Sequence, residues 1–165
     1  MKIFYFSGVK LPSQNSDSIH VMKMAQAFGK AGHDVTLFAQ SVGAASEELY
    51  EIYDTEQCFK MHLVSGLDLP FLSHVNQYRT LAQTMKTTAR PDLFYGHDPL
   101  ALTLFNDGSP IIFEAHGMPT KPAQGWALKQ LIKNKNLHAI VAVSDVLKKD
   151  LLTLFPEIDP EQIFV

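Results

Sequence analysis

Four short apolar runs in this chain each end at a small polar cluster. The runs and the clusters that follow them are 3–6 before Ser7 and Gly8, 93–95 before Gly96, His97 and Asp98, 111–113 before Glu114, His116 and Gly117, and 140–143 before Ser144. Runs of β-branched and aromatic residues with helical patterns after them predict strands of a parallel sheet that is buried on both faces. Ligands bind outside the carboxyl ends of such strands, so we expect the polar clusters to face a shared cleft.

Strands and helices alternate along the chain, which predicts a Rossmann-like, doubly wound and mostly parallel sheet with helices on both faces. The first strand is followed by a turn-rich loop over 7–17 and by a helix that begins near Ser18 and stops at Gly32. The other expected helices cover 46–53, 75–89, a short segment after Asp98, 125–133 and a segment after Ser144. The other expected strands cover 35–38 and 59–63.

The composition is that of an ordinary folded domain. The chain has 165 residues, of which 46% are hydrophobic and 19% are charged, far from the pattern of a disordered chain. A net charge of -3 without a dense cluster of lysine or arginine excludes nucleic acid as an expected partner. Cys58 is the only cysteine, so no intrachain disulfide can form, and a reducing cytoplasm is the expected location.

A membrane-spanning helix is not expected, because no segment approaches about 18 consecutive apolar residues. Met1 and Lys2 lead directly into a strand, so a signal peptide is not expected either. Peripheral association with the inner face of the membrane is an alternative, based on one stretch of basic residues around Trp126. This stretch contains Lys121, Lys129, Lys133 and Lys135. A solvated helix face is the interpretation that such a pattern favours.

Motif spacing excludes several kinds of α/β enzyme. The glycine patterns of dinucleotide-binding and phosphate-binding loops are absent, as is the G-x-S-x-G pattern of serine hydrolases. The pairs His97/Asp98 and Glu114/His116 lack the spacing of known zinc motifs, so no metal is expected. What remains is a cleft rich in hydroxyl, amide, carboxylate and imidazole groups, which suits a sugar or a phosphosugar.

Four segments in order resemble family 4 glycosyltransferases. The segment 18–28 with the G-H-D-V-T-L sequence at 32–37 is similar to the opening helix and strand of that family. The segments 91–97 (P-D-L-F-Y-G-H), 114–117 (E-A-H-G) and 140–144 (I-V-A-V-S) resemble later motifs of the same family. The resemblance covers nearly the whole chain.

This resemblance implies the two-domain GT-B architecture. Residues 1–162 would form the N-terminal, acceptor-side domain, and 163–165 would begin a linker or the C-terminal, donor-binding domain. The parent enzyme would transfer a sugar from a nucleotide-sugar donor to a glycan, lipid-linked or small-molecule acceptor with retention of configuration. It would need no cofactor, and this chain alone would be inactive. The alternatives are a non-transferase GT-B relative, such as an epimerase, and a stand-alone module that binds a sugar or a protein without catalysis.

The resemblance also assigns roles to residues. His116 would be the catalytic residue that orients the donor sugar near the reaction centre. The other assigned positions are His97, Asp98, Glu114 and Gly117 at the acceptor, and Ser7, Gly8, Asn15 and Ser16 in the donor-phosphate loop, where many family members carry a Gly-Gly pair. Ser144 and His20 are possible site residues. The residues alone offer alternatives: Asp98 and Ser144 are good helix caps, Glu114 can pair with Lys121, and His20 can be structural.

Overall fold

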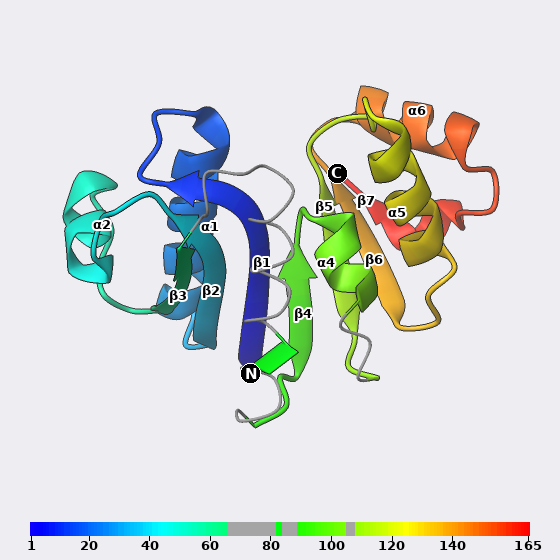
Figure 1. Ribbon diagram of the computed structural model, residues 1–165. Helices are drawn as coiled ribbons and strands as arrows, with labels where there is room; N and C mark the ends of the chain where they lie inside the picture. Colours follow the sequence, from blue (N-terminus) through cyan, green and yellow to red (C-terminus); the bar gives the residue numbers. More distant parts are fainter. Residues whose placement is uncertain (66–81, 84–88, 105–107) are drawn as a thin grey trace. The chain divides into compact units, whose positions relative to one another are not determined.

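The computed structural model divides the chain into two units, Met1–Asp92 and Leu93–Val165. It describes residues 1–65, 82–83, 89–104 and 108–165. The helix expected over 75–89 lies outside the described residues except at 82–83, which are helical, and at 89. Each unit consists of parallel strands joined by helices (Figure 1).

In the first unit, three parallel strands lie in the order β3-β2-β1. They are β1 (Lys2–Leu11), β2 (Asp34–Ser41) and β3 (Lys60–Ser65). Helix α1 (Ser16–Lys30) connects β1 to β2, and α2 (Ser46–Ile52) connects β2 to β3. Gly32 has a φ of 86°, which confirms the predicted left-handed stop after α1.

Strand β1 is longer than its apolar run, and this corrects the loop expected over 7–17. Ser7 and Gly8 lie inside the strand. The register with β2 shifts after Phe6, and pairing resumes at Lys10 and at Leu11, which is fully buried. The strand therefore continues through an irregular stretch, of the kind that a β-bulge introduces, and the loop shrinks to 12–15.

In the second unit, four parallel strands lie in the order β4-β5-β6-β7. They are β4 (Leu93–Gly96), β5 (Ile111–Ala115), β6 (Leu137–Ala142) and β7 (Ile163–Phe164). The helices are α4 (Pro99–Leu104), α5 (Pro122–Ile132), α6 (Asp145–Leu154) and the short 3-10 helix η1 (Pro160–Gln162). Helices α4 and α5 pack against each other, and α4 contacts β4 and β5 (Figure 1).

Burial of the strands confirms the predicted Rossmann-like, doubly wound α/β class. The successive side chains of 3–6 in β1 are all at most 1% exposed, so both faces of this strand are covered. Ile111 and Phe113 of β5 and Ile140 of β6 are also buried. Continuous burial along a strand is the property of a parallel sheet with cover on both sides.

Helix ends follow local hydrogen bonds. Helix α5 begins at Pro122, before the expected Gly125, because Gln124 Oε1 accepts from the backbone amides of Thr120 and Lys121, each at 3.2 Å. Helix α6 begins after Ser144, whose Oγ accepts from the Leu147 amide at 3.2 Å, as a cap should.

Among the described residues, no helix is long and apolar enough to cross a membrane.

Candidate functional site

The predicted site residues of the second unit, apart from Ser144, lie at the carboxyl ends of β4 and β5. The two strands are paired, with Tyr95 opposite Ile112 and Gly96 opposite Phe113. His97 and Asp98 follow β4, and His116 and Gly117 follow β5. The imidazole rings of His97 and His116 lie 5.2 Å apart between centroids, at an interplanar angle of 36°. The pairing of parallel strands therefore brings together two of the predicted site residues that are far apart in the sequence.

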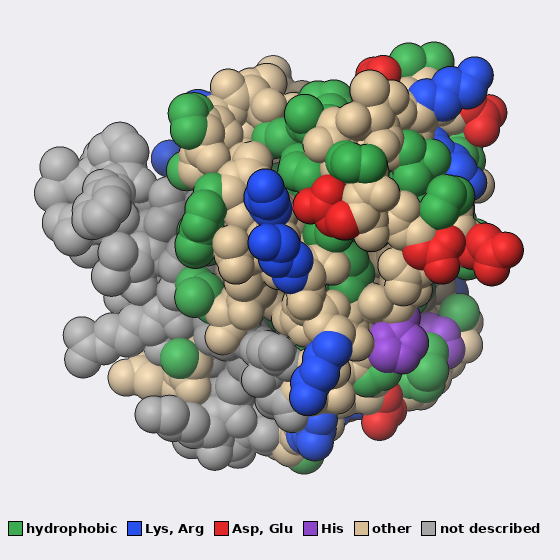
Figure 2. Space-filling view, turned by 90° about the vertical axis from the view of Figure 1, so that its right-hand side faces the viewer, with side chains coloured by type: hydrophobic (Ala, Val, Ile, Leu, Met, Phe, Trp, Pro, Cys, Tyr) green, Lys and Arg blue, Asp and Glu red, His purple; other side chains and the backbone are tan. Residues whose placement is uncertain are grey.

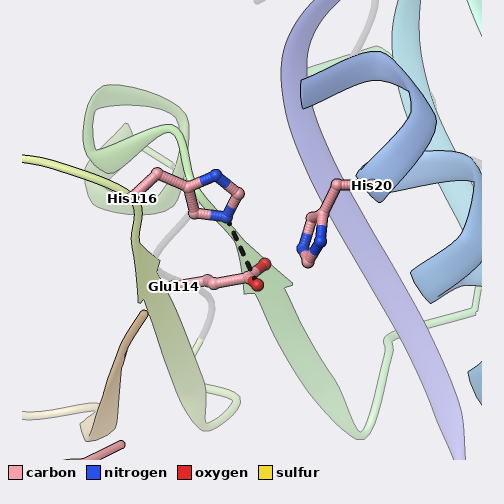
Figure 3. A group of neighbouring side chains, drawn as sticks. All are labelled: His20, Glu114 and His116. Atoms are coloured by element: carbon pink, nitrogen blue, oxygen red, sulfur yellow. Dashed lines mark ion pairs between the residues drawn. The ribbon is translucent and has the colours of Figure 1, made fainter. Parts of the chain in front are cut away.

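His116 also lies against a buried carboxylate. Its Nε2 atom is 3.3 Å from Oε1 of Glu114 (Figure 3). The side chain of Glu114 is 4% exposed and that of His116 is 25% exposed. A carboxylate at this depth needs donors or positive charge around it, because desolvation of an unpaired charge is costly. Glu114 thus has His116 as a partner, while Lys121, the alternative partner, lies exposed at the start of α5.

Tyr95 is the residue of this cluster that sequence reasoning missed. It lies in β4 and is 5% exposed. Burial, the negative charge of Glu114 and a hydrogen bond to Glu114 raise the pKa of the Tyr95 phenol well above its usual value. The signal in the sequence was the one hydroxyl-bearing side chain in the apolar run 93–95, because a buried tyrosine hydroxyl usually has a partner.

Asp98 acts as the cap of α4. Its Oδ1 atom accepts from the backbone amides of Leu100 at 3.0 Å and Ala101 at 3.2 Å. The cap that Asp98 and Pro99 predicted is therefore present, at the residue next to His97. Gly117 is exposed immediately after His116.

The candidate residues of the first unit lie in β1 and at the start of α1. Ser7 is buried and its Oγ accepts from the Val9 amide at 3.2 Å. Asn15 is the residue before α1 and Ser16 is its first residue, and both are exposed. His20 lies one turn further along α1 and is half-buried. The helix was expected to begin near Ser18, yet it begins at Ser16, and the side chain of Asn15 before it makes no capping hydrogen bond.

The family model described as Glycosyltransferase Family 4 matches residues 18–165. The chain belongs to this family. A comparison with curated protein sequences gave no significant match.

Solved structures with the same fold include three that this family 4 chain matches over nearly its whole length. The lipopolysaccharide outer core galactosyltransferase WaaB in its apo form is 14% identical, with a TM-score of 0.64 and coverage of 100% of this chain and 45% of that chain. UDP-GlcNAc 2-epimerase from Methanocaldococcus jannaschii is 14% identical, with a TM-score of 0.72 and coverage of 100% of this chain and 45% of that chain. Arabidopsis thaliana UGT89C1 complexed with UDP-L-rhamnose is 10% identical, with a TM-score of 0.67 and coverage of 99% of this chain and 48% of that chain.

These likenesses show the fold, which is that of the N-terminal half of GT-B enzymes. The chain spans less than half the length of each of these three proteins. A transferase and an epimerase share the fold, so the fold alone does not separate these two activities.

The surface of this family 4 chain carries mixed charge on the face drawn in Figure 2, where basic, acidic and apolar side chains are interspersed. Helix α5 buries Ala127, Leu128 and Leu131 and leaves Trp126 58% exposed. Lys121 and Lys129 are exposed on the same segment. This is a helix with one buried face, as the solvated-face interpretation predicts, and with an exposed indole in addition.

Proposed function

We propose that this chain is the N-terminal, acceptor-side domain of a GT-B enzyme that transfers a sugar from a nucleotide-sugar donor, with retention of configuration. The acceptor is a glycan, a lipid-linked sugar or a small molecule. The observation that carries the proposal is the contact between His116 and the buried Glu114 at the end of β5, in a chain that belongs to glycosyltransferase family 4. Two matched structures support the choice of donor class: UDP-GlcNAc 2-epimerase from Neisseria meningitidis with bound UDP-GlcNAc, and UGT89C1 with bound UDP-L-rhamnose.

In this proposal His116 is the catalytic residue and orients the donor sugar at the reaction centre. The acceptor contacts His97, Asp98 and Gly117, and Glu114, also expected at the acceptor, lies buried against His116. The donor phosphate meets Asn15 and Ser16, because the free amides and dipole at the start of α1 attract anions. Ser7 and Gly8 of β1 are the other proposed members of this donor-phosphate segment. Ser144 and His20 are secondary candidates, of which Ser144 already serves as a helix cap.

The proposal places most of the donor in a second domain. Residues 1–162 are the acceptor-side domain, and 163–165, of which Ile163 and Phe164 pair with β6, lead toward the donor-binding domain. Positioning and charge stabilisation by both domains are needed for transfer, so we propose that this chain alone is inactive. The proposed reaction uses no metal and no other cofactor.

The test is the His116→Ala substitution in the full-length protein, with turnover measured as release of the nucleoside diphosphate in the presence of acceptor. We expect turnover to fall by about 100-fold or more, a loss typical of a residue that acts at the reacting atoms. The matched control is His138→Ala, which replaces an exposed histidine on β6 of the same unit. Turnover near the wild-type value in His116→Ala would refute the role.

Product analysis separates the proposal from its alternative. NMR of the product should show the same anomeric configuration as the donor. Conversion of the nucleotide sugar to an epimer without any acceptor would instead support a non-transferase GT-B relative.

The proposed location is the cytoplasm, with peripheral association at the inner face of the membrane. The exposed Trp126 and the basic residues of α5 support the association, because interfacial binding combines an apolar side chain with attraction to anionic lipids. Cosedimentation of the full-length protein with phosphatidylglycerol vesicles should fall in Trp126→Ala. Equal sedimentation of the two proteins would exclude this role for α5.

A further inference from the structure

We propose that Glu114 and Tyr95 are positioning residues that hold His116 in the tautomer with hydrogen on Nε2, so that its Nδ1 atom accepts a hydrogen bond from a hydroxyl group of the ligand. The tautomer follows from the geometry of the second unit. The identity of the ligand group as a sugar hydroxyl rests on the function proposed above.

The first step is the contact between the ring and the carboxylate. His116 Nε2 lies 3.3 Å from Glu114 Oε1. In neutral imidazole one ring nitrogen carries hydrogen and the other carries a lone pair. A lone pair on Nε2 would face the lone pairs of the carboxylate oxygen, which is repulsive, whereas an N–H group in that position is attracted to it. The neutral ring therefore carries its hydrogen on Nε2.

The second step is that Glu114 is held as an acceptor. Its side chain is 4% exposed, so its oxygens depend on protein donors more than on water. Tyr95 bonds Glu114, and the pKa of Tyr95 is raised, so the phenol keeps its proton and donates it. A carboxylate that receives this hydrogen bond is stabilised in its ionised form, and its negative charge attracts the imidazole N–H 3.3 Å away.

The third step is that the ring and the carboxylate are held in place. Glu114 lies opposite Val141 of β6, and the Val143 amide donates to the Ala115 carbonyl at 3.2 Å. The backbone at the end of β5 is therefore fixed by pairing with β6 and the residues that follow it. The His97 ring packs at 5.2 Å from the His116 ring and restricts its rotation. Nε2 thus stays toward Glu114, and the other ring nitrogen points away from the carboxylate (Figure 3).

The chemical consequence concerns what His116 can bind. A ring nitrogen with a lone pair accepts a hydrogen bond from a neutral hydroxyl and repels the oxygens of a phosphate or a carboxylate. In its neutral form His116 therefore favours hydroxyl groups of a carbohydrate, and the phosphates of a donor must be bound by other groups. A histidine held in the opposite tautomer, or held doubly protonated, would favour anions instead.

The experiment is NMR of the ring nitrogens in full-length protein labelled with ¹⁵N-histidine, at a pH where the imidazoles are neutral. His116 is assigned by the signal that disappears in His116→Gln, and His138 is the internal control. We expect His116 in the wild type to show one tautomer, with hydrogen on Nε2. Hydrogen on Nδ1 in the wild type would overturn the proposal, whatever happens to any variant.

The variants test the cause. Glu114→Leu removes the carboxylate at similar volume, and we expect a mixture of the two tautomers for His116 with no change at His138. An unchanged single tautomer in a folded Glu114→Leu protein would show that Glu114 does not set it. Tyr95→Phe removes only the hydroxyl and should shift the His116 ring signals, whereas identical signals would exclude Tyr95 from the arrangement.

Inorganic phosphate probes the ligand class. We expect it to leave the Nδ1 signal of His116 unchanged, and a phosphate-dependent shift of that signal would overturn the hydroxyl assignment.

The outcomes distinguish failure of this inference from failure of the proposed function. Hydrogen on Nδ1 combined with loss of turnover in His116→Ala rejects this inference and leaves the transferase role. Hydrogen on Nε2 combined with normal turnover in His116→Ala does the reverse.

Discussion

The hydroxyl group of Tyr53 binds both backbone polar groups of Ser13. It accepts from the Ser13 amide at 2.7 Å and donates to the Ser13 carbonyl at 2.9 Å. The same carbonyl accepts from Ser18 Oγ at 2.8 Å, and Tyr53 is 6% exposed. The segment 12–15, which leads into α1, is therefore held from the end of α2 and from α1 itself.

Removal of this hydroxyl in Tyr53→Phe should lower the free energy of unfolding by about 0.5–1.5 kcal/mol, because two half-buried backbone groups of Ser13 each lose a partner. Urea denaturation measures the loss. Ser13→Ala is the matched control, since it keeps the backbone groups that bind Tyr53, and we expect it to cost less. Equal stability of Tyr53→Phe and the wild type would mean that water replaces the phenol at no cost.

Gly29 lies where α1 meets Cys58. A Cβ atom added at Gly29 would lie 2.9 Å from Cys58 Sγ and 3.0 Å from the Cys58 carbonyl carbon. Gly29→Ala should therefore lower the free energy of unfolding by about 1–3 kcal/mol, the usual cost of overpacking. Thermal unfolding monitored by circular dichroism measures the change.

Gly125 provides the opposite case. A Cβ atom there would be no closer than 4.0 Å to the neighbouring Pro119 side chain, and Gly125 lies within α5. Gly125→Ala should raise the free energy of unfolding by about 0.5–1 kcal/mol, since alanine favours the helix over glycine. If both alanine variants shifted stability in the same direction, the close approach at Cys58 would not be the cause.

His62 gives the stability a dependence on pH. Burial lowers the pKa of His62 in the folded chain, while the unfolded value is about 6.5. Below that value the unfolded chain binds the proton more readily, so this contribution is present above about pH 6.5 and is lost as pH falls toward the folded pKa. His62→Phe should flatten the pH dependence of the urea midpoint in that range. An unchanged slope would mean that another group causes it.

Asp98 can be tested as a cap and as a ligand contact in one pair of variants. Asp98→Ala should cost about 1 kcal/mol of stability, because α4 loses its cap, whereas Asn is as good a cap as Asp. Asp98→Asn should therefore keep the stability. A normal KM for the acceptor in Asp98→Asn would mean that Asp98 serves only as a helix cap. A raised KM with normal stability would support the proposed contact between Asp98 and the acceptor.

Strand positions and helix stops were predictable because they depend on local chemistry. The apolar runs at 93–95 and 111–113 lie in β4 and β5, and the left-handed Gly32 ends the first helical segment. Ser144 caps α6 for the same reason. The approach of His97 to His116 followed from parallel strands that end at one edge.

What the sequence did not predict depends on contacts between distant residues. Ser7 and Gly8 are typical turn residues, yet they continue β1 because pairing with β2 resumes at Lys10. The role of Tyr95 appears only when β4 and β5 are side by side and Glu114 is buried next to it. Tyr53 looks like part of a helical face, and its bonds to Ser13 span 40 residues.

Strand β7 has a practical consequence for expression of this protein. Its two residues pair with Ile140 and Val141 of β6, and Lys148 Nζ donates to the Ile163 carbonyl at 2.6 Å. A shortened version that stopped before Ile163 would expose the backbone groups of β6 on that side. An open, apolar strand edge pairs readily with another chain, so such a version should aggregate, whereas one that retains Ile163 and Phe164 should remain monodisperse in gel filtration.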